Sequence, residues 1–220
     1  FKVLLAVNAN AVTPGPLMVI LGLVSLLFAS FMLYRRRDIK RFFAYSSIEH
    51  MGIIAFAFGI GGPVANFAGL LHMTMHSLTK SAIFFAVGHI AQAKGTQKFA
   101  DIRGLSVSHP ALAVAFGLCV VAIAGLPPFG IFTSEFMLVT STFARQPFLA
   151  LLLGLGLLVA FGALVLRLQG VLFGEPTGAS HKTTATLIPV YIHIAIVLVA
   201  GVFLPWPFVK WFEQVARMLG

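Results

Sequence analysis

Three ionisable side chains stand four residues apart in an otherwise apolar stretch: His72, His76 and Lys80. A step of four residues turns an α-helix only about 40° beyond a full turn, so the three share one helix face, a stripe about 12 Å long. Histidine changes charge near neutral pH and a buried lysine can also do so, which makes the row a candidate proton relay. The alternative is a set of buried polar groups that hydrogen-bond to neighbouring helices for packing.

A carboxylate follows an interruption in another apolar stretch. Glu135 stands shortly after Leu126-Pro127-Pro128-Phe129-Gly130. Prolines break a helix and leave polar backbone groups, which are tolerated at membrane depth only beside protein or water. We therefore expect Glu135 to be a terminal proton-binding group of the relay. A helix-capping or interfacial glutamate is the alternative.

Further charged groups lie near the start of an earlier apolar stretch. Glu49 and His50 are adjacent, so on a helix they point about 100° apart and can serve two different contacts. They stand close to Lys40 and Arg41, and all four are either relay groups or residues of the headgroup zone. Arg167 is interpreted as an interfacial side chain and His193 as a packed one. His89 lies about half a turn off the row and near the end of its helix, so it is a weaker relay candidate.

The composition indicates what surrounds these groups. Of the 220 residues, 59% are hydrophobic and 10% are charged, whereas soluble domains are about 25% charged. This predicts an all-α membrane protein, one transmembrane bundle over residues 1–220 without a soluble domain. The basic residues that give the net charge of +9 stand at the ends of apolar runs, which favours topology signals over nucleic-acid binding.

The apolar runs predict about seven transmembrane helices, because a spanning helix needs about 20 residues. Residues 109–144 would form a helix of about 54 Å, too long for one crossing of about 30 Å, so they are predicted as two crossings, the second irregular. An interfacial amphipathic helix closes the chain at residues 206–219. The predicted spans are about 16–34, 42–60, 64–93, 109–125, 130–144, 147–173 and 184–204.

Seven crossings would place most basic residues on one side of the membrane. Arg35–Arg41, Lys94–Arg103 and Arg145 would share that side with Lys210 and Arg217, and only Lys2 and Lys182 would lie opposite. The positive-inside rule makes the richer side cytoplasmic.

The chain opens with Phe1 and without the layout of a signal peptide, so we expect a piece of a longer protein.

Other signatures exclude several classes of site. Cys119 is the single cysteine, so neither a disulfide nor a cysteine metal site is available. We find no phosphate-binding glycine loop, HExxH, paired CxxC or nucleophile elbow. No cofactor, no bound metal and no active site of its own are expected.

Three ordered motifs resemble a known family. They are Asp38-Ile39-Lys40-Arg41-Phe42-Phe43-Ala44-Tyr45-Ser46-Ser47, His72-x3-His76-x3-Lys80, and Ala124-Gly125-Leu126-Pro127-Pro128-Phe129-Gly130 leading to Ser134-Glu135-Phe136. They are similar to the antiporter-like, proton-pumping subunits of respiratory complex I, Mrp sodium/proton antiporters and energy-converting hydrogenases. The run Ser46 to Gly52 most resembles the F subunits of hydrogenase-4 and its formate hydrogenlyase relatives.

The resemblance implies more than the residues alone. Family members have about fourteen helices in two inverted repeats of five, and this chain resembles the C-terminal half, one five-helix repeat with flanking helices. By position, Lys80 with His72 and His76 would be the central relay and Glu135 the terminal group of a discontinuous helix. Many relatives have lysine where Glu135 stands, so the charge is reversed there, as it is in some members.

The expected function follows from both arguments. We expect a multi-pass subunit of the inner (plasma) membrane that relays protons in a complex of the hydrogenase-4, formate hydrogenlyase or NADH-quinone oxidoreductase type. Its partners would be lipid, other membrane subunits, and redox subunits with iron-sulfur and NiFe centres. The alternatives are a subunit of an Mrp-type sodium/proton antiporter, in which Glu135 or Glu49 would handle sodium, and a structural membrane scaffold.

Overall fold

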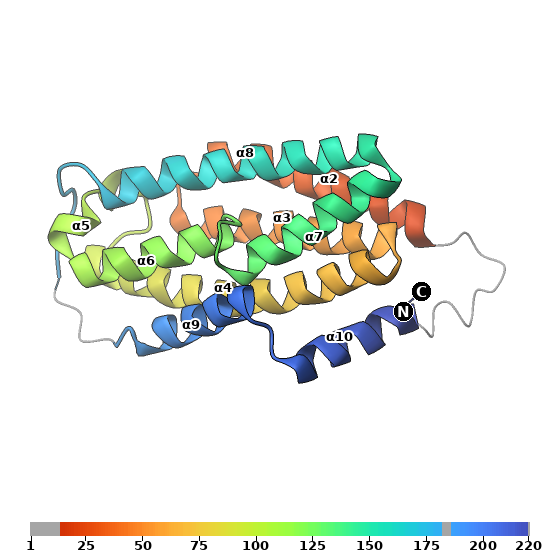
Figure 1. The fold of residues 1–220 in the computed structure, drawn as a ribbon. Coiled ribbons are helices and arrows are strands. Elements are labelled where there is room, and N and C mark those ends of the chain that lie inside the picture. Colours follow the sequence, from red (N-terminus) through yellow and green to blue (C-terminus); the bar gives the residue numbers. More distant parts are fainter. Residues whose placement is uncertain (1–13, 182–185, 220) are drawn as a thin grey trace.

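The computed structural model describes residues 14–181 and 186–219. In these two ranges the chain is helical without a strand, and its longer helices lie side by side along one bundle (Figure 1). The elements are α2 (Pro14–Arg35), α3 (Ile39–Ile60), α4 (Pro63–Lys94), the 3-10 turn η1 (Phe99–Asp101), α5 (Leu105–Ser108), α6 (Pro110–Ile123), α7 (Gly130–Arg145), α8 (Pro147–Leu172), α9 (Ile188–Val202) and α10 (Trp206–Leu219). The predicted all-α class is confirmed.

Local sequence signals set the helix ends. Asp38 caps α3, because its Oδ1 accepts a hydrogen bond of 2.9 Å from the backbone N–H of Arg41. The reversal between α3 and α4 uses Gly61 and Gly62, with φ of 64° and 82°, which glycine adopts without strain. Prolines then occupy the first position of α4, α6 and α8, where their missing N–H costs nothing.

The bundle has two ends, which we call the arginine end (Arg35–Arg41) and the glycine end (Gly61–Pro63). Helices α2, α3 and α4 run alternately between them, so α4 finishes at the arginine end (Figure 1). The start of α6 is held there by the backbone of His181. Its N–H donates to Ala93 O at 2.8 Å, and its carbonyl oxygen lies 3.1 Å from His109 Nε2. Helices α6 and α7 then follow end to end toward the glycine end (Figure 1).

Two sequence expectations about this region are wrong. Arg145, at the end of α7, donates from Nη1 to Gly61 O at 3.0 Å, so it lies at the glycine end and not with Arg35–Arg41. Arg217 also lies there, because its neighbour Ala216 accepts a hydrogen bond of 3.3 Å from Asn66 near the start of α4. The reason is length: the 14 residues of α6 and 16 of α7 reach about 21 and 24 Å, so neither spans about 30 Å alone.

By length and composition, three helices of the described ranges could cross a membrane: α2, α3 and α8. A fourth is possible if α9 and α10, which meet at a bend of 75°, count as one broken span. Helix α4, with 32 residues, is long enough to cross but is not among these candidates. It carries the histidines and the lysine. These criteria do not support the predicted seven spans, and residues 182–185, where the last predicted span begins, lie outside the described ranges together with Lys2.

Polar and apolar residues are distributed as in a membrane protein. Large apolar side chains cover the outside of α2 and α8, for example Ile20 at 59% and Leu151 at 66% exposure. Charged groups lie inside, where Glu49 and Lys80 are 1% and 5% exposed. Because lipid solvates apolar side chains and charges are costly in it, this arrangement suits a multi-pass membrane subunit.

Candidate functional site

The row of ionisable residues predicted on one helix face lies in the middle of α4 and points into the bundle. His72, His76 and Lys80 are 1%, 4% and 5% exposed. The structure brings α3 against this face, with Glu49 and His50 at the middle of α3 and each 1% exposed. Glu49 and His50 therefore lie inside the bundle and not at its ends.

A chain of hydrogen bonds joins three helices at this point. His50 Nδ1 lies 2.9 Å from His72 Nε2, and His72 Nδ1 lies 2.9 Å from Ser134 Oγ of α7. Ser134 in turn donates to the backbone carbonyl of Ile131 at 2.7 Å. Both rings and the hydroxyl are buried.

The Ser134 bond fixes where the protons lie. Because the hydroxyl hydrogen points to Ile131 O, the Ser134 oxygen accepts from His72 Nδ1. His72 Nε2 then carries no proton and accepts from His50 Nδ1. In the neutral rings the outer nitrogen of His50 is left free to accept a proton.

That outer nitrogen faces a carboxylate. His50 Nε2 lies 3.3 Å from Glu49 Oε2. Both atoms are buried, and neither makes a hydrogen bond of good geometry within the described residues. One proton placed between them would satisfy both atoms, so the pair can load a proton onto the histidine chain.

His76 and Lys80 flank this chain. The ring of His76 stacks on that of His50, with centroids 4.9 Å apart, and its two nitrogens have no hydrogen bond within the described residues. Lys80 Nζ donates to Phe43 O at 2.9 Å and lies within range of a charge interaction with Glu49. Lys80 is thus near Glu49 and is not bonded to Glu135.

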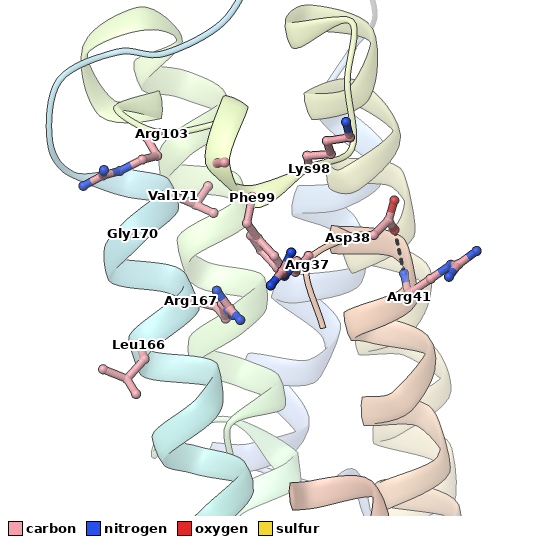
Figure 2. Close-up of a pocket in the computed structure, with 11 residues that line it drawn as sticks. Arg37, Asp38, Arg41, Lys98, Phe99, Arg103, Leu166, Arg167, Gly170 and Val171 are labelled. Atoms are coloured by element: carbon pink, nitrogen blue, oxygen red, sulfur yellow. Dashed lines mark hydrogen bonds between the residues drawn. The ribbon is translucent and has the colours of Figure 1, made fainter. Parts of the chain in front are cut away.

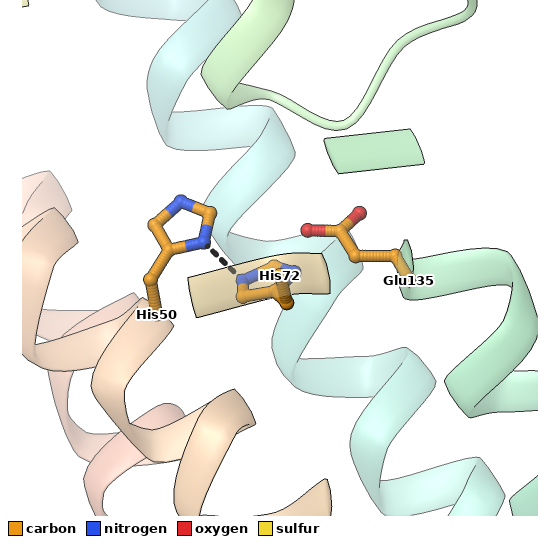
Figure 3. A group of neighbouring side chains, drawn as sticks. All are labelled: His50, His72 and Glu135. Atoms are coloured by element: carbon orange, nitrogen blue, oxygen red, sulfur yellow. Dashed lines mark hydrogen bonds between the residues drawn. The ribbon is translucent and has the colours of Figure 1, made fainter. Parts of the chain in front are cut away.

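Glu135 approaches the histidines from the break between α6 and α7. Figure 3 shows its carboxylate directed toward His50 and His72, and one polar atom from each of the three lies within 4.8 Å of the others. The approach needs Gly125, whose φ is 66° and where a Cβ would overlap the carboxylate. These three residues are also the group in the described ranges that could hold a metal ion, but a metal would compete with protons for the same atoms.

A cavity of about 280 Å³ adjoins Glu49, His50 and Glu135. It is lined by Glu49, His50, Gly125 and Glu135 and by residues of α8 such as Phe161. A water molecule takes about 30 Å³, so several waters fit between the Glu49–His50 pair and Glu135. The cavity therefore has room for water between groups that are not in direct contact.

The remaining predicted residues lie elsewhere. Lys40 is exposed in the first turn of α3 and is not brought to the histidines. Arg167 donates to the backbone carbonyls of Tyr34 and Arg36, and His193 contacts Pro189 O at 2.7 Å. Ser134 was missed by sequence reasoning, although it directly precedes Glu135 in the motif after the proline pair.

The chain is similar to known proteins in sequence and in fold. Residues 2–161 match the family described as NADH:quinone oxidoreductase/Mrp antiporter, TM. The chain is 57% identical over its full length to 46% of the hydrogenase-4 component F homolog of Methylacidiphilum infernorum. Among solved structures it is similar to respiratory complex I from Thermus thermophilus (TM-score 0.85, 24% identity, 94% of this chain and 44% of that one). It is also similar to the Mrp complex from Dietzia (TM-score 0.79, 18% identity, 92% and 46%). The chain thus spans less than half the length of each.

Proposed function

The chain belongs to the transmembrane family described as NADH:quinone oxidoreductase/Mrp antiporter, and on that premise we propose that it relays protons in a redox-driven membrane complex of the hydrogenase-4 or NADH-quinone oxidoreductase type. The observation that carries the proposal is the buried chain from Glu49 through His50 and His72 to Ser134, with Glu135 beside it. Each member either holds or accepts a proton, and successive heavy atoms lie 2.9 to 3.3 Å apart.

The relay works by exchanging protons between neighbouring groups. A proton taken up by Glu49 passes to His50 Nε2, and His50 then releases its Nδ1 proton to His72. The His72 ring, now carrying two protons, passes one to Glu135, whose carboxylate has an oxygen within 4.8 Å of a His72 ring nitrogen. Lys80 takes part through its charge, because it interacts electrostatically with Glu49.

The passage of the chain through the membrane is part of the proposal. Helices α2, α3, α4, the broken α6–α7 segment and α8 make five passes, which fits the five-helix repeat implied by the family. Helices α9 and α10 follow as a bent flanking segment. Counting α6–α7 as one discontinuous pass replaces the two crossings expected from its length, so we propose six passes for the described residues.

Electron transfer belongs to partner subunits in this account. The relative at 57% identity is named a hydrogenase-4 component F homolog, which favours a redox-driven complex with iron-sulfur and NiFe centres. The alternative, a sodium/proton antiporter, is supported by the shared family model and by a likeness of fold at 18% identity. The protein would lie in the inner (plasma) membrane beside other membrane subunits.

The experiment is proton uptake by membrane vesicles that contain the full-length protein with its native partners. Glu135→Gln keeps the size of the side chain but removes its ability to ionise, so we expect proton uptake to fall at least about tenfold while the complex stays assembled. Glu213→Gln, an exposed glutamate of α10 paired with Arg217 at 3.7 Å, is the control and should leave uptake unchanged. A scaffold role would instead give normal uptake in every Glu135→Gln complex that assembles.

A further inference from the structure

A second cavity, of about 760 Å³, lies at the arginine end, away from the histidines. Figure 2 shows it between the start of α3, the η1 turn and the last turns of α8. Its charged lining consists of Arg37, Asp38, Arg41, Lys98, Arg103 and Arg167.

The charges of this cavity are unbalanced. Five cations and one carboxylate line it, which leaves a net charge of +4. The carboxylate of Asp38 is engaged with the backbone N–H of Arg41. Within the described ranges, none of the five cations has a carboxylate oxygen within 4.0 Å, since the ion pairs there are those of Glu49 and Glu213. The cavity is therefore suited to an anion.

One cation is held in place by the protein. Arg167 Nη2 donates to Tyr34 O at 3.0 Å and to Arg36 O at 2.9 Å, and its guanidinium lies 4.9 Å from the centre of the Phe99 ring. A guanidinium has five N–H donors, so three remain for a ligand after these two bonds. A fixed planar donor of this kind is typical of phosphate recognition.

The other side of the cavity is apolar and continuous with the lipid-facing surface. Val171 and Leu166 line it, and Leu166 is 58% exposed. The exposed apolar side chains continue along α8 at helical spacing through Leu158 at 67%, Leu155 at 46% and Leu151 at 66%. A cationic pocket at the end of an apolar track matches a molecule with a phosphate head and an acyl chain.

We propose that this cavity binds the phosphate headgroup of an anionic phospholipid, whose acyl chain lies along α8. Basic pockets between transmembrane helices recognise such headgroups, and nothing in the proton relay requires these residues. The inference depends on the membrane placement of α8 and is independent of the route that protons take.

The test is native mass spectrometry of the full-length protein, purified with its partners, delipidated and titrated with phosphatidylglycerol. Arg37→Gln with Arg103→Gln removes two charges from the lining, and we expect the dissociation constant to rise by about 10- to 30-fold. Arg35→Gln with Lys40→Gln is the control, since both residues are exposed at the same end without lining the cavity. Arg41→Gln with Lys98→Gln provides a second lining pair if the first does not fold.

Two further measurements complete the test. Phosphatidylcholine should bind at least about tenfold more weakly than phosphatidylglycerol, because its headgroup has no net charge. Inorganic phosphate should not displace phosphatidylglycerol at equal concentration. Equal binding by the lining and control pairs would overturn the proposal, and displacement by inorganic phosphate would assign the cavity to a free anion.

Discussion

His50 and His72 stand on different helices and share a hydrogen bond of 2.9 Å between Nδ1 and Nε2, with both rings buried. Two neutral imidazoles bonded in this way have opposite roles, since one nitrogen must donate and the other accept. The pair is therefore polarised, and the direction is set by Ser134 at its far side. The bond therefore links α3 and α4 through two side chains that can pass a proton from one to the other.

The first prediction concerns Ser134. Ser134→Ala would leave the His72 Nδ1 proton without an acceptor in a buried site, which costs about 1–3 kcal/mol. Without that acceptor the ring loses its preferred tautomer, so we expect a lower melting temperature and slower proton uptake by the assembled complex.

Ser141→Ala is the matched control for this change. Ser141 also lies in α7 and donates to a carbonyl three residues earlier, at 3.0 Å, but it has no histidine partner. It should cost less than about 1 kcal/mol and leave uptake intact. Equal effects of the two alanines would mean that Ser134 does not orient His72.

The second prediction concerns the helix break. Gly125→Ala introduces a methyl group that overlaps the Glu135 carboxylate, at a φ of 66° that costs an alanine about 1–2 kcal/mol. We expect the melting temperature to fall and proton uptake to be lost together, because Glu135 has to move away from the histidines.

Gly88→Ala tests whether that effect is specific to the site. A Cβ at Gly88, within α4, has no neighbouring atom within 4 Å, so alanine should stabilise the helix by about 0.5–1 kcal/mol. Normal uptake by a Gly125→Ala complex would show that the close approach to Glu135 is dispensable.

The third prediction separates one crossing by α6–α7 from two. In a background with Cys119, the single cysteine, replaced by alanine, cysteines are introduced singly at the exposed positions Lys98 and Gln146. One crossing places them on opposite faces of the membrane. An impermeant maleimide should therefore label Lys98→Cys and Gln146→Cys in vesicles of opposite orientation. Labelling of both from one face would restore the two-crossing topology.

Much of the bundle follows from the sequence, because helix breaks have local causes. The reversal at Gly61-Gly62-Pro63 and the break at Leu126-Pro127-Pro128-Phe129-Gly130 both occur where glycine and proline predict them. The spacing of His72, His76 and Lys80 predicted a shared face, and all three are buried.

The rest depends on contacts between helices, which periodicity does not encode. The sequence left Glu49 and His50 undecided between the bundle and the headgroup zone, since only packing against α4 turns them inward. The expected side for Arg145 was wrong, because the length of residues 109–144 alone cannot distinguish two crossings from two short helices placed end to end. Ser134 was missed because a serine in a helix usually bonds its own backbone, and its second bond to His72 needs the fold.

The relay itself is tested most directly by chemical rescue at His72. In vesicles with the complete complex, His72→Ala should lower proton uptake at least about tenfold, since it removes the ring that links His50 to Ser134. Added imidazole, which can accept and donate a proton, should restore part of the uptake, whereas pyrrole, of similar size but unable to accept, should not. Wild-type uptake by His72→Ala, or equal rescue by both compounds, would contradict a proton path through His72.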